Sequence, residues 1–195
     1  MALICGIDEA GRGSLAGPVA VAGCVVPEDF RLEGLQDSKK LSASARLKLY
    51  HLIKENVNAF FVVFIGPRRI EKFNILQAVM RGVEKVVSRL QADFYIIDGN
   101  HKPDSLKNRY DVECLVDADE KLAAVSAASV LAKVSRDCLM AWIEKKYPSY
   151  RFSLHKGYGT ATHFEEIQRF GISIIHRSTF SPCAKLEQKL LLIDY

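Results

Sequence analysis

Apolar residues follow two spacings along the chain, the period of two that is typical of strands and the three-to-four spacing that is typical of helices. Short apolar runs that are rich in β-branched and aromatic residues predict strands. These runs lie at residues 3–8, 18–26, 59–66, 94–98 and 111–119. Because only a glycine-rich turn separates the first two runs, we expect them to form a hairpin or neighbouring strands.

Four other segments have apolar residues at helical spacing. They cover residues 43–57, about 70–90, about 122–146 and 163–170. Ser42 is a suitable N-cap for the first of these helices, Pro148 follows the third, and Gly171 is a suitable stop for the last. Strands that alternate with helices predict an α/β fold with a central sheet.

Length and composition limit the domain organisation. The chain has 195 residues, of which 49% are hydrophobic, which is enough for one full core. Since no repeat or low-complexity linker divides it, we expect one domain over residues 1–195. Residues from about 160 are expected to form a C-terminal helical extension of that domain.

Charge and cysteine content indicate the cellular setting. The five cysteines show no Cys-x-x-Cys spacing, which favours reduced thiols in the cytoplasm. Neither a basic leader nor a long apolar segment is visible, so we expect neither a secretory signal nor contact with a membrane. The net charge of +4 is compatible with a polyanionic partner but does not by itself select one.

Carboxylates occur where several of the predicted strands end. Asp8 ends the first run, Asp98 ends the fourth, and Asp117 and Asp119 end the fifth. Carboxylates from separate strands can hold Mg²⁺ or Mn²⁺, and two such ions about 4 Å apart promote phosphodiester hydrolysis. The alternative is that each acid only favours the turn after its strand.

The Gly-Arg-Gly sequence at 11–13 follows the first strand and allows three interpretations. Together with its flanking residues it matches the spacing of a dinucleotide-binding fingerprint, but Pro18 leads into a second strand where that fingerprint needs a helix. The glycines could instead let the backbone approach a sugar-phosphate closely, with Arg12 available to a phosphate. The third interpretation is a tight turn with a solvated arginine.

The predicted helix at 122–146 carries polar residues on one side. Ser126, Ser129, Lys133 and Arg136 recur at helical spacing opposite an apolar stripe. This face could meet phosphate or simply be solvated. For Arg136, an ion pair inside the fold and a contact with substrate both stay open. The five histidines show no metal-ligand spacing, and we expect most of them to be structural or exposed.

Six blocks in the order of a known family cover nearly the whole chain, and together they resemble ribonuclease HII. They are GIDEAGRGSLAGPV at 6–19, DSKKLS at 37–42, IIDGN at 96–100, SAASVLAKVSRD at 126–137, HKGYGTATH at 155–163 and GISIIHRSTF at 171–180. The resemblance implies an RNase H-like fold, a central mixed β-sheet flanked by helices with a C-terminal helical region. It also implies a bacterial enzyme of ribonucleotide excision repair that cuts the RNA strand of RNA/DNA hybrids and single ribonucleotides embedded in duplex DNA.

The resemblance also implies a set of catalytic acids. The four acids of the family fall on Asp8, Glu9, Asp98 and Asp119, which would be both catalytic and metal-binding. The cofactor would be Mg²⁺ or Mn²⁺, with two ions present when substrate is bound. Asp117 competes with Asp119 for the fourth position. Because neighbouring side chains of a strand point to opposite faces, Glu9 joins Asp8 only if the strand is ending, or else contributes its backbone carbonyl.

Substrate contacts follow from the same resemblance. Gly11, Arg12 and Gly13 correspond to the segment that recognises the ribose 2′-hydroxyl, and Tyr158 would stack on the next deoxyribose. Lys39 and Lys40 are candidates for phosphate contacts. The implied partners are RNA/DNA hybrid and DNA that contains ribonucleotides, with the protein acting as a monomer. The implied cut lies 5′ of the ribonucleotide and leaves a 3′-hydroxyl and a 5′-phosphate.

Two other functions remain open at this stage. A ribonuclease HIII-like nuclease would cut longer RNA tracts and would cut poorly at a single ribonucleotide. A non-catalytic module that binds RNA/DNA hybrids would keep the basic residues and lose the acids. The four acids argue against the module.

Overall fold

The computed structural model describes residues 2–35, 40–181 and 183–185. These residues form two compact units, and each is described here by itself. Unit 1 draws on residues 1–10, 20–64 and 79–135, and unit 2 draws on residues 11–19, 65–78 and 136–195. Two helices contribute residues to both units. The expected single domain with a helical extension from about residue 160 stays a prediction.

The strands and helices follow the alternation that the sequence predicts. The strands are β1 Leu3–Ala10, β2 Val19–Pro27, β3 Ala59–Ile65, β4 Phe94–Asp98 and β5 Val112–Leu115. The helices are α1 Ala43–Asn56, α2 Pro67–Phe73, α3 Ile75–Arg89, α4 Ala118–Lys121, α5 Ala123–Glu144, α6 Phe152–His155 and α7 Ala161–Phe170, together with the short 3₁₀ helix η2 Asp104–Leu106. Of the helices within the described ranges, none has both the length and the hydropathy that a membrane crossing requires.

Unit 1 is built on a mixed sheet with the strand order β3-β2-β1-β4-β5. β1 is antiparallel to β2, which confirms the predicted neighbouring strands. On its other edge β1 is parallel to β4, and β4 is parallel to β5. The fold class expected from the sequence, an α/β fold with a central mixed sheet, is confirmed.

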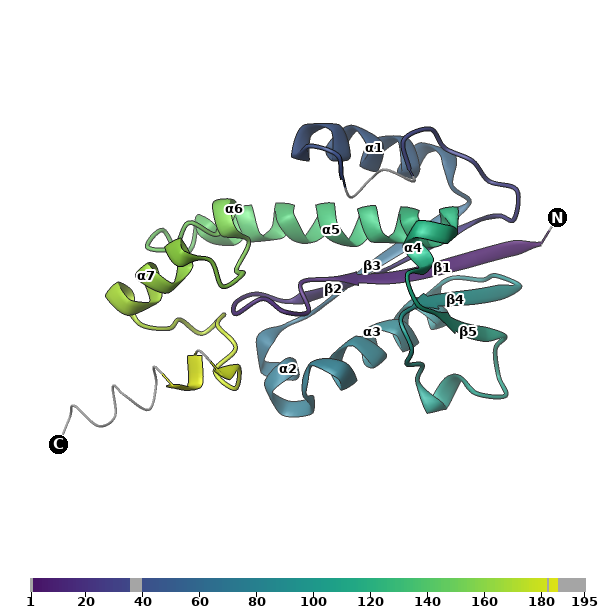
Figure 1. Cartoon of the computed structure of the whole chain (residues 1–195). Coiled ribbons are helices and arrows are strands. Elements are labelled where there is room, and N and C mark those ends of the chain that lie inside the picture. The colour runs from purple at the N-terminus through teal and green to yellow at the C-terminus, as the bar shows by residue number, and fades with distance from the viewer. Residues whose placement is uncertain (1, 36–39, 182, 186–195) are drawn as a thin grey trace. The chain divides into compact units, whose positions relative to one another are not determined.

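Helices α1 and α5 cover one face of the sheet and α3 covers the other (Figure 1). Because successive side chains of a strand point to opposite faces, β2 contributes to both layers. Ala22 and Cys24 belong to the core cluster that contains residues of α1 and the first half of α5. On the opposite face, α3 lies so close to the sheet that a Cβ on Gly23 would come within 2.3 Å of Val86. Both faces of the sheet are therefore covered, which accounts for the continuous apolar run of β2.

Gly6 lets α5 approach β1. A Cβ at this position would lie 2.2 Å from the backbone carbonyl carbon of Ala124, the second residue of α5. Since that neighbour is backbone, it cannot turn aside as a side chain could. The glycine thus sets the distance between the central strand and the helix that covers it.

Helix ends agree with the predicted signals at two places. The hydroxyl of Ser42 accepts a hydrogen bond from the Ala45 N–H at 3.2 Å and caps α1. Gly171 follows α7 with a φ of 78°, a conformation that favours glycine. The third predicted helix runs over Ala123–Glu144, within two residues of the expected bounds.

Two predicted elements were wrong in their extent. The stretch at about 70–90 consists of two helices, because Asn74 takes a φ of 66° between α2 and α3 and its side chain accepts a hydrogen bond from the Gln77 N–H. The run at 111–119 leaves the sheet at Leu115, and Asp119 lies in the short helix α4. The acids at 117 and 119 therefore do not end a strand.

Unit 2 has a core of its own around aromatic side chains. Its buried apolar members are Leu15, Ala16, Met140, Tyr150, Phe152, Ile167 and Cys183. The rings of Tyr150 and Phe152 stack at 5.2 Å between centroids. Residues 11–18 run beside this core without regular secondary structure until β2 begins, apart from an isolated bridge between Ala16 and His176.

We predict that Gly6→Ala destabilises the protein by about 2 kcal/mol or more, because the added methyl group overlaps the backbone of α5. Gly66→Ala is a matched control: Gly66 has a φ of −72° and no atom within 4 Å of its would-be Cβ. The control should cost less than about 1 kcal/mol, the cost of a changed N-cap. Urea unfolding measures both values, and equal losses would contradict the close approach.

Candidate active site

The strand register in unit 1 brings two carboxylates side by side. Ile7 of β1 pairs with Ile97 of β4 in a parallel ladder, so the next residue on each strand is an aspartate. These are Asp8, which is 8% exposed, and Asp98, which is half-buried. Ile7 pairs with Gly23, which faces α3, so Ile7 and its partner Ile97 lie on the α3 face of the sheet. Because successive side chains alternate between faces, Asp8 and Asp98 both point to the face covered by α5. The structure thus brings together two acids that the sequence placed at strand ends, but β1 continues to Ala10, so the prediction that Asp8 ends its strand was wrong.

Asp119 is attached to this pair through the backbone. The Asp98 carboxylate accepts a hydrogen bond from the Ala118 N–H at 2.8 Å, which holds the first turn of α4 against the end of β4. Asp119 follows directly and is 8% exposed, whereas Asp117 is exposed and has a φ of 54°. Burial therefore favours Asp119 over Asp117 as the fourth acid.

The surroundings of Asp8 penalise its charge. The pKa of Asp8 is raised to about 7, chiefly by burial and then by the negative charges of Glu9 and Asp98. Hydrogen bonds from the Ser129 hydroxyl and from the Glu9 N–H, at 2.7 Å to Asp8 Oδ1, act in the opposite direction. The three acids are therefore close enough to repel one another, and a bound cation would relieve that repulsion.

Glu9 lies in a regular part of β1. The strand continues to Ala10, and Glu9 pairs with Val21 of β2. Because the strand has not ended, the Glu9 side chain leaves on the face opposite that of Asp8. Of the two contributions left open by the sequence, this geometry favours the backbone carbonyl of Glu9.

The donors of this carboxylate cluster, Asp8, Glu9, Asp98 and Asp119, suit a hard divalent cation. Asp8, Asp98 and Asp119 would offer carboxylate oxygens and Glu9 its backbone carbonyl oxygen, and Mg²⁺ and Mn²⁺ prefer oxygen ligands of these kinds. The electrostatic repulsion on Asp8 favours a positive ion among them. Within the described ranges, no group of three or more Asp, Glu, His or Cys side chains is arranged to hold a metal ion. The residue types and their charges fit the metal, but their side chains are not gathered around one point; only Asp8 and Asp98 are brought together by the strand register.

The Gly-Arg-Gly segment belongs to unit 2 and forms a turn. Gly11 has a φ of 89°, a conformation that glycine adopts without strain. Its carbonyl accepts a hydrogen bond from the Ser14 hydroxyl at 2.9 Å, which closes the turn. Gly11 is buried, while Arg12 and Gly13 are exposed. No helix begins within the glycines, so the dinucleotide-binding interpretation is wrong.

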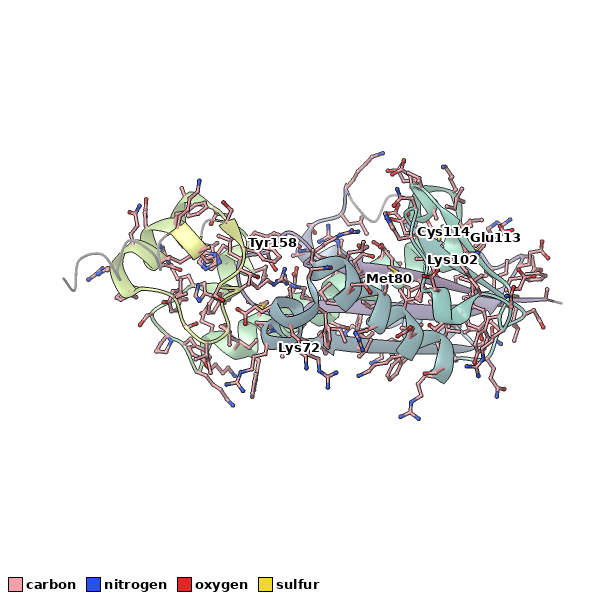
Figure 2. The ribbon with its side chains drawn as sticks, turned by 90° about the horizontal axis from the view of Figure 1, so that it is seen from below. Lys72, Met80, Lys102, Glu113, Cys114 and Tyr158 are labelled. Carbon is pink, nitrogen blue, oxygen red and sulfur yellow. The ribbon has the colours of Figure 1, made fainter. Side chains whose placement is uncertain are left out.

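Tyr158 comes from the loop between α6 and α7 (Figure 2). Its half-buried ring lies over the guanidinium of Arg136, 5.2 Å from the centroid. Gly157 accepts hydrogen bonds from the Leu15 and Ala16 N–H groups, at 2.7 and 3.2 Å. The loop of Tyr158 is thereby joined to the segment that follows the Gly-Arg-Gly turn.

One of the two candidate lysines lies among the described residues. Lys40 is exposed, just before α1, as a phosphate contact requires. Lys39 lies outside the described residues.

Arg136 differs from both of its expected roles. It is fully buried, and it donates to the carbonyls of Pro18 and Ala16 and to the hydroxyl of Ser14. Within the described residues its Nη1 is a buried nitrogen without a hydrogen-bond partner. The arginine thus supports the backbone of the segment after the glycine turn, and it does not lie on a face open to phosphate.

Three histidines that are far apart in the sequence form one buried cluster. The ring nitrogens of His163 and His176 lie 3.1 Å apart, and the rings of His155 and His163 stack at 4.1 Å between centroids. His163 Nδ1 faces the carbonyl of Tyr158, and His155 Nδ1 accepts from the Gly157 N–H. The histidine cluster, His155, His163 and His176, therefore fixes the loop that carries Tyr158. Sequence spacing gave no signal for it.

The partners of each ring select one neutral tautomer. His163 must donate through Nδ1 to a carbonyl, which leaves its Nε2 as the acceptor for the Nε2–H of His176. His176 Nδ1 then accepts from the Ser173 N–H at 2.9 Å. Burial, together with the smaller effect of a neighbouring histidine, lowers the pKa of both His163 and His176 to about 4. A proton added to this chain would place two donors face to face.

Comparison with known proteins shows which family the chain is similar to. The family model described as Ribonuclease HII matches residues 5–183. The ribonuclease HII of Endomicrobium trichonymphae is 46% identical over 181 residues, which cover 92% of this chain and 85% of that protein. The ribonuclease HII of Coxiella burnetii, strain Dugway 5J108-111, is 42% identical over 187 residues, 95% of this chain and 91% of that protein.

Solved structures of similar fold come from two related groups. The ribonuclease H2 of Pyrococcus horikoshii OT3 has a TM-score of 0.77 at 27% identity and covers 97% of this chain and 99% of its own. The RNase HII of Archaeoglobus fulgidus, solved in complex with PCNA, has a TM-score of 0.79 at 26% identity over 91% and 95% of the two chains. Bst-RNase HIII in complex with Mn²⁺ shares the fold, with a TM-score of 0.74 at 21% identity over 96% and 70%.

We predict that the histidine cluster lowers stability as the pH drops from about 6.5 to about 4, against a smaller opposite effect of Asp8, whose raised pKa favours the folded state at low pH. His163 and His176 have pKa values of about 4 when folded, below the ordinary value of 6.5, so the unfolded chain binds more protons in this window. Each contributes at most about 1.4 kcal/mol per pH unit. Urea unfolding at pH 7.0 and 5.0 measures the loss.

The variants His163→Gln and His51→Gln isolate the contribution of the cluster. His163→Gln removes one buried titrating ring and should lose less stability between the two pH values than the native protein, even though it starts from a lower value. His51 is an exposed histidine of α1, and its replacement should leave the pH dependence unchanged. Equal pH dependence in all three proteins would contradict the assignment.

Proposed function

This chain belongs to the ribonuclease HII family and is a ribonuclease HII that acts on RNA/DNA hybrids, and from that premise we propose that it also cuts duplex DNA on the 5′ side of a single embedded ribonucleotide. The products would be a 3′-hydroxyl and a 5′-phosphate. The observation that carries the proposal is the parallel register of β1 and β4, in which Asp8 and Asp98 directly follow the paired residues Ile7 and Ile97, together with the hydrogen bond that holds the residue before Asp119 against Asp98. The alternatives, a ribonuclease HIII-like specificity and a non-catalytic module, are outcomes of the experiment below.

Asp8, Glu9, Asp98 and Asp119 would hold Mg²⁺ or Mn²⁺, two ions when substrate is bound. Such ions activate a water molecule and stabilise the leaving oxygen of a phosphodiester. Support comes from the mutual repulsion at Asp8 and from the Mn²⁺ in the structure of Bst-RNase HIII. Asp98 would also position another ligand, because its carboxylate accepts a hydrogen bond from the N–H of Ala118, the residue before Asp119.

Recognition of the ribonucleotide would belong to unit 2. Peptide groups of Gly11, Arg12 and Gly13 would hydrogen-bond the 2′-hydroxyl, the group that distinguishes a ribose from a deoxyribose. The ring of Tyr158 would stack on the next deoxyribose and disfavour a second ribose there. The exposure of Arg12 and Gly13 and the hydrogen-bonded loop of Tyr158 support these roles.

Phosphate contacts would come from basic residues ahead of α1. Lys40, and Lys39 next to it in the sequence, would meet the sugar-phosphate backbone, where a cation adds affinity without reading sequence. The substrate would be bound by a monomer in the cytoplasm. The net charge of +4 has the sign that a nucleic acid partner requires.

We predict that Asp98→Asn and Asp119→Asn each lower the rate of cleavage at a single ribonucleotide by about a hundredfold or more, because each removes a charged ligand. The substrate is an end-labelled DNA duplex with one ribonucleotide, incubated with Mg²⁺ or Mn²⁺. Asp117→Asn is the matched control. It makes the same chemical change two residues away, and asparagine tolerates the left-handed backbone of that position.

The control should stay within about twofold of the native rate. Loss of activity in Asp117→Asn with activity retained in Asp119→Asn would move the fourth ligand to Asp117. A native protein that cuts an RNA/DNA hybrid but not the single ribonucleotide would have HIII-like specificity, and one that cuts neither would be a binding module.

We predict that the upstream product can be extended by a DNA polymerase and that the downstream product begins with the ribonucleotide. Both results follow if water attacks the phosphorus and the ribose 2′-hydroxyl is only recognised. Comparison with an alkali ladder, which breaks the chain 3′ of the ribonucleotide, gives the position of the cut. A 2′,3′-cyclic phosphate would show that the 2′-hydroxyl itself is the nucleophile.

A further inference from the structure

Residues 11–18 need hydrogen-bond partners from outside their own segment. They lie between the end of β1 and the start of β2 and form no ladder, and both Gly11 and Gly17 have positive φ values. Buried backbone carbonyls without a ladder must be satisfied in some other way. In unit 2 this is done by two buried arginines, Arg136 and Arg177.

Arg177 binds the glycine turn itself. Its Nη2 donates to the Gly11 carbonyl and its Nη1 to the Arg12 carbonyl, each at 2.8 Å. Its Nε donates to the Gly17 carbonyl at 3.1 Å. One planar guanidinium thus holds both ends of the segment, and a lysine, with a single nitrogen, could not reproduce this fork.

These bonds fix the direction of two N–H groups. In a trans peptide the C=O and the following N–H point in opposite directions. When Arg177 holds the carbonyls of Gly11 and Arg12, the N–H groups of Arg12 and Gly13 are turned away from the guanidinium. Those two residues are the exposed part of the turn, where the proposed function places the ribose 2′-hydroxyl.

The neighbour of Arg177 holds the other recognition segment. His176 Nε2 lies 3.1 Å from His163, whose Nδ1 holds the Tyr158 carbonyl at 2.9 Å. Consecutive residues therefore anchor the glycine turn and the tyrosine loop. The Arg177 N–H adds a hydrogen bond to the Leu15 carbonyl at 2.8 Å, between the two.

The cost of this arrangement argues that it has a purpose beyond packing. Arg177 and Arg136 are both 0% exposed. Burial, together with the positive charge of Arg136, lowers the pKa of Arg177 to about 9. Two buried cations side by side are a poor way to stabilise a core, and apolar residues of similar volume often stabilise it more. What the cations add is a defined backbone geometry.

We propose that Arg177 is a positioning residue for ribose recognition, which orients the peptide N–H groups of Arg12 and Gly13 toward the 2′-hydroxyl. This inference rests on the proposed function of the glycine turn. It predicts that Arg177 determines the preference of the protein for a ribose over a deoxyribose, in addition to any effect on stability.

The test is binding to two DNA duplexes that differ by one 2′-hydroxyl, measured by fluorescence anisotropy in an Asp98→Asn background. The measured quantity is the preference for ribose, that is, the dissociation constant of the all-DNA duplex divided by that of the duplex with the ribonucleotide. We expect Arg177→Met to lower this ratio about tenfold and Arg177→Lys to lower it less, with little change in the affinity for the all-DNA duplex. Arg169→Met, at an exposed position of α7 in the same unit, should leave the ratio unchanged.

A purely structural role would weaken binding to both duplexes by one factor and leave the ratio intact, and that result would overturn the inference. So would circular dichroism showing that neither Arg177 variant folds, because the arginine would then be needed by the unit as a whole. If the Asp98→Asn protein with its native arginine shows no preference for the ribonucleotide, the proposed function of the turn fails, and this inference fails with it.

Discussion

The double pairing of β1 is the constraint on which the candidate active site depends. The strand is held on one edge by an antiparallel partner and on the other by a parallel one, so neither its register nor its end can shift without loss of both ladders. Gly6 adds a third restraint by admitting α5 against the strand. As a result the position of Asp8 next to Asp98 is fixed, although the negative charge of Asp98 disfavours the charged form of Asp8.

The same pairing explains why an electrostatically unfavourable group persists. A buried aspartate with a pKa raised to about 7 does not stabilise the fold at neutral pH. The sheet holds Asp8 there because the apolar contacts of β1 and β2 outweigh the local cost. A site for divalent cations has this form: the repulsion is kept by the surrounding structure and is relieved only when the positive ion binds.

The sequence predicted what depends on local pattern and missed what depends on distant partners. The five strands, the Ser42 cap and the Gly171 stop follow from neighbouring residues, and all are present in the structure, although the runs at 3–8 and 111–119 end at other residues than predicted. The sequence missed the break at Asn74 and the short helix that contains Asp119. In each case a single residue, Asn74 or Asp117, takes a positive φ that the surrounding hydrophobic pattern does not predict. The burial of Arg136 was beyond reach, because its hydrogen-bond acceptors lie about 120 positions earlier in the chain.

The two halves of the proposed mechanism place different demands on the backbone. Carboxylates for a metal can be displayed from strand ends, because a ladder already fixes their Cα atoms. Recognition of a sugar hydroxyl by peptide groups needs N–H and C=O groups that no ladder has used, and a segment of that kind is intrinsically mobile. In unit 2 the buried guanidinium of Arg177 and the neutral histidine cluster supply the missing hydrogen bonds. Under the proposed function, the blocks HKGYGTATH and GISIIHRSTF would share one role, to hold rigid the two loops whose backbones would meet the substrate.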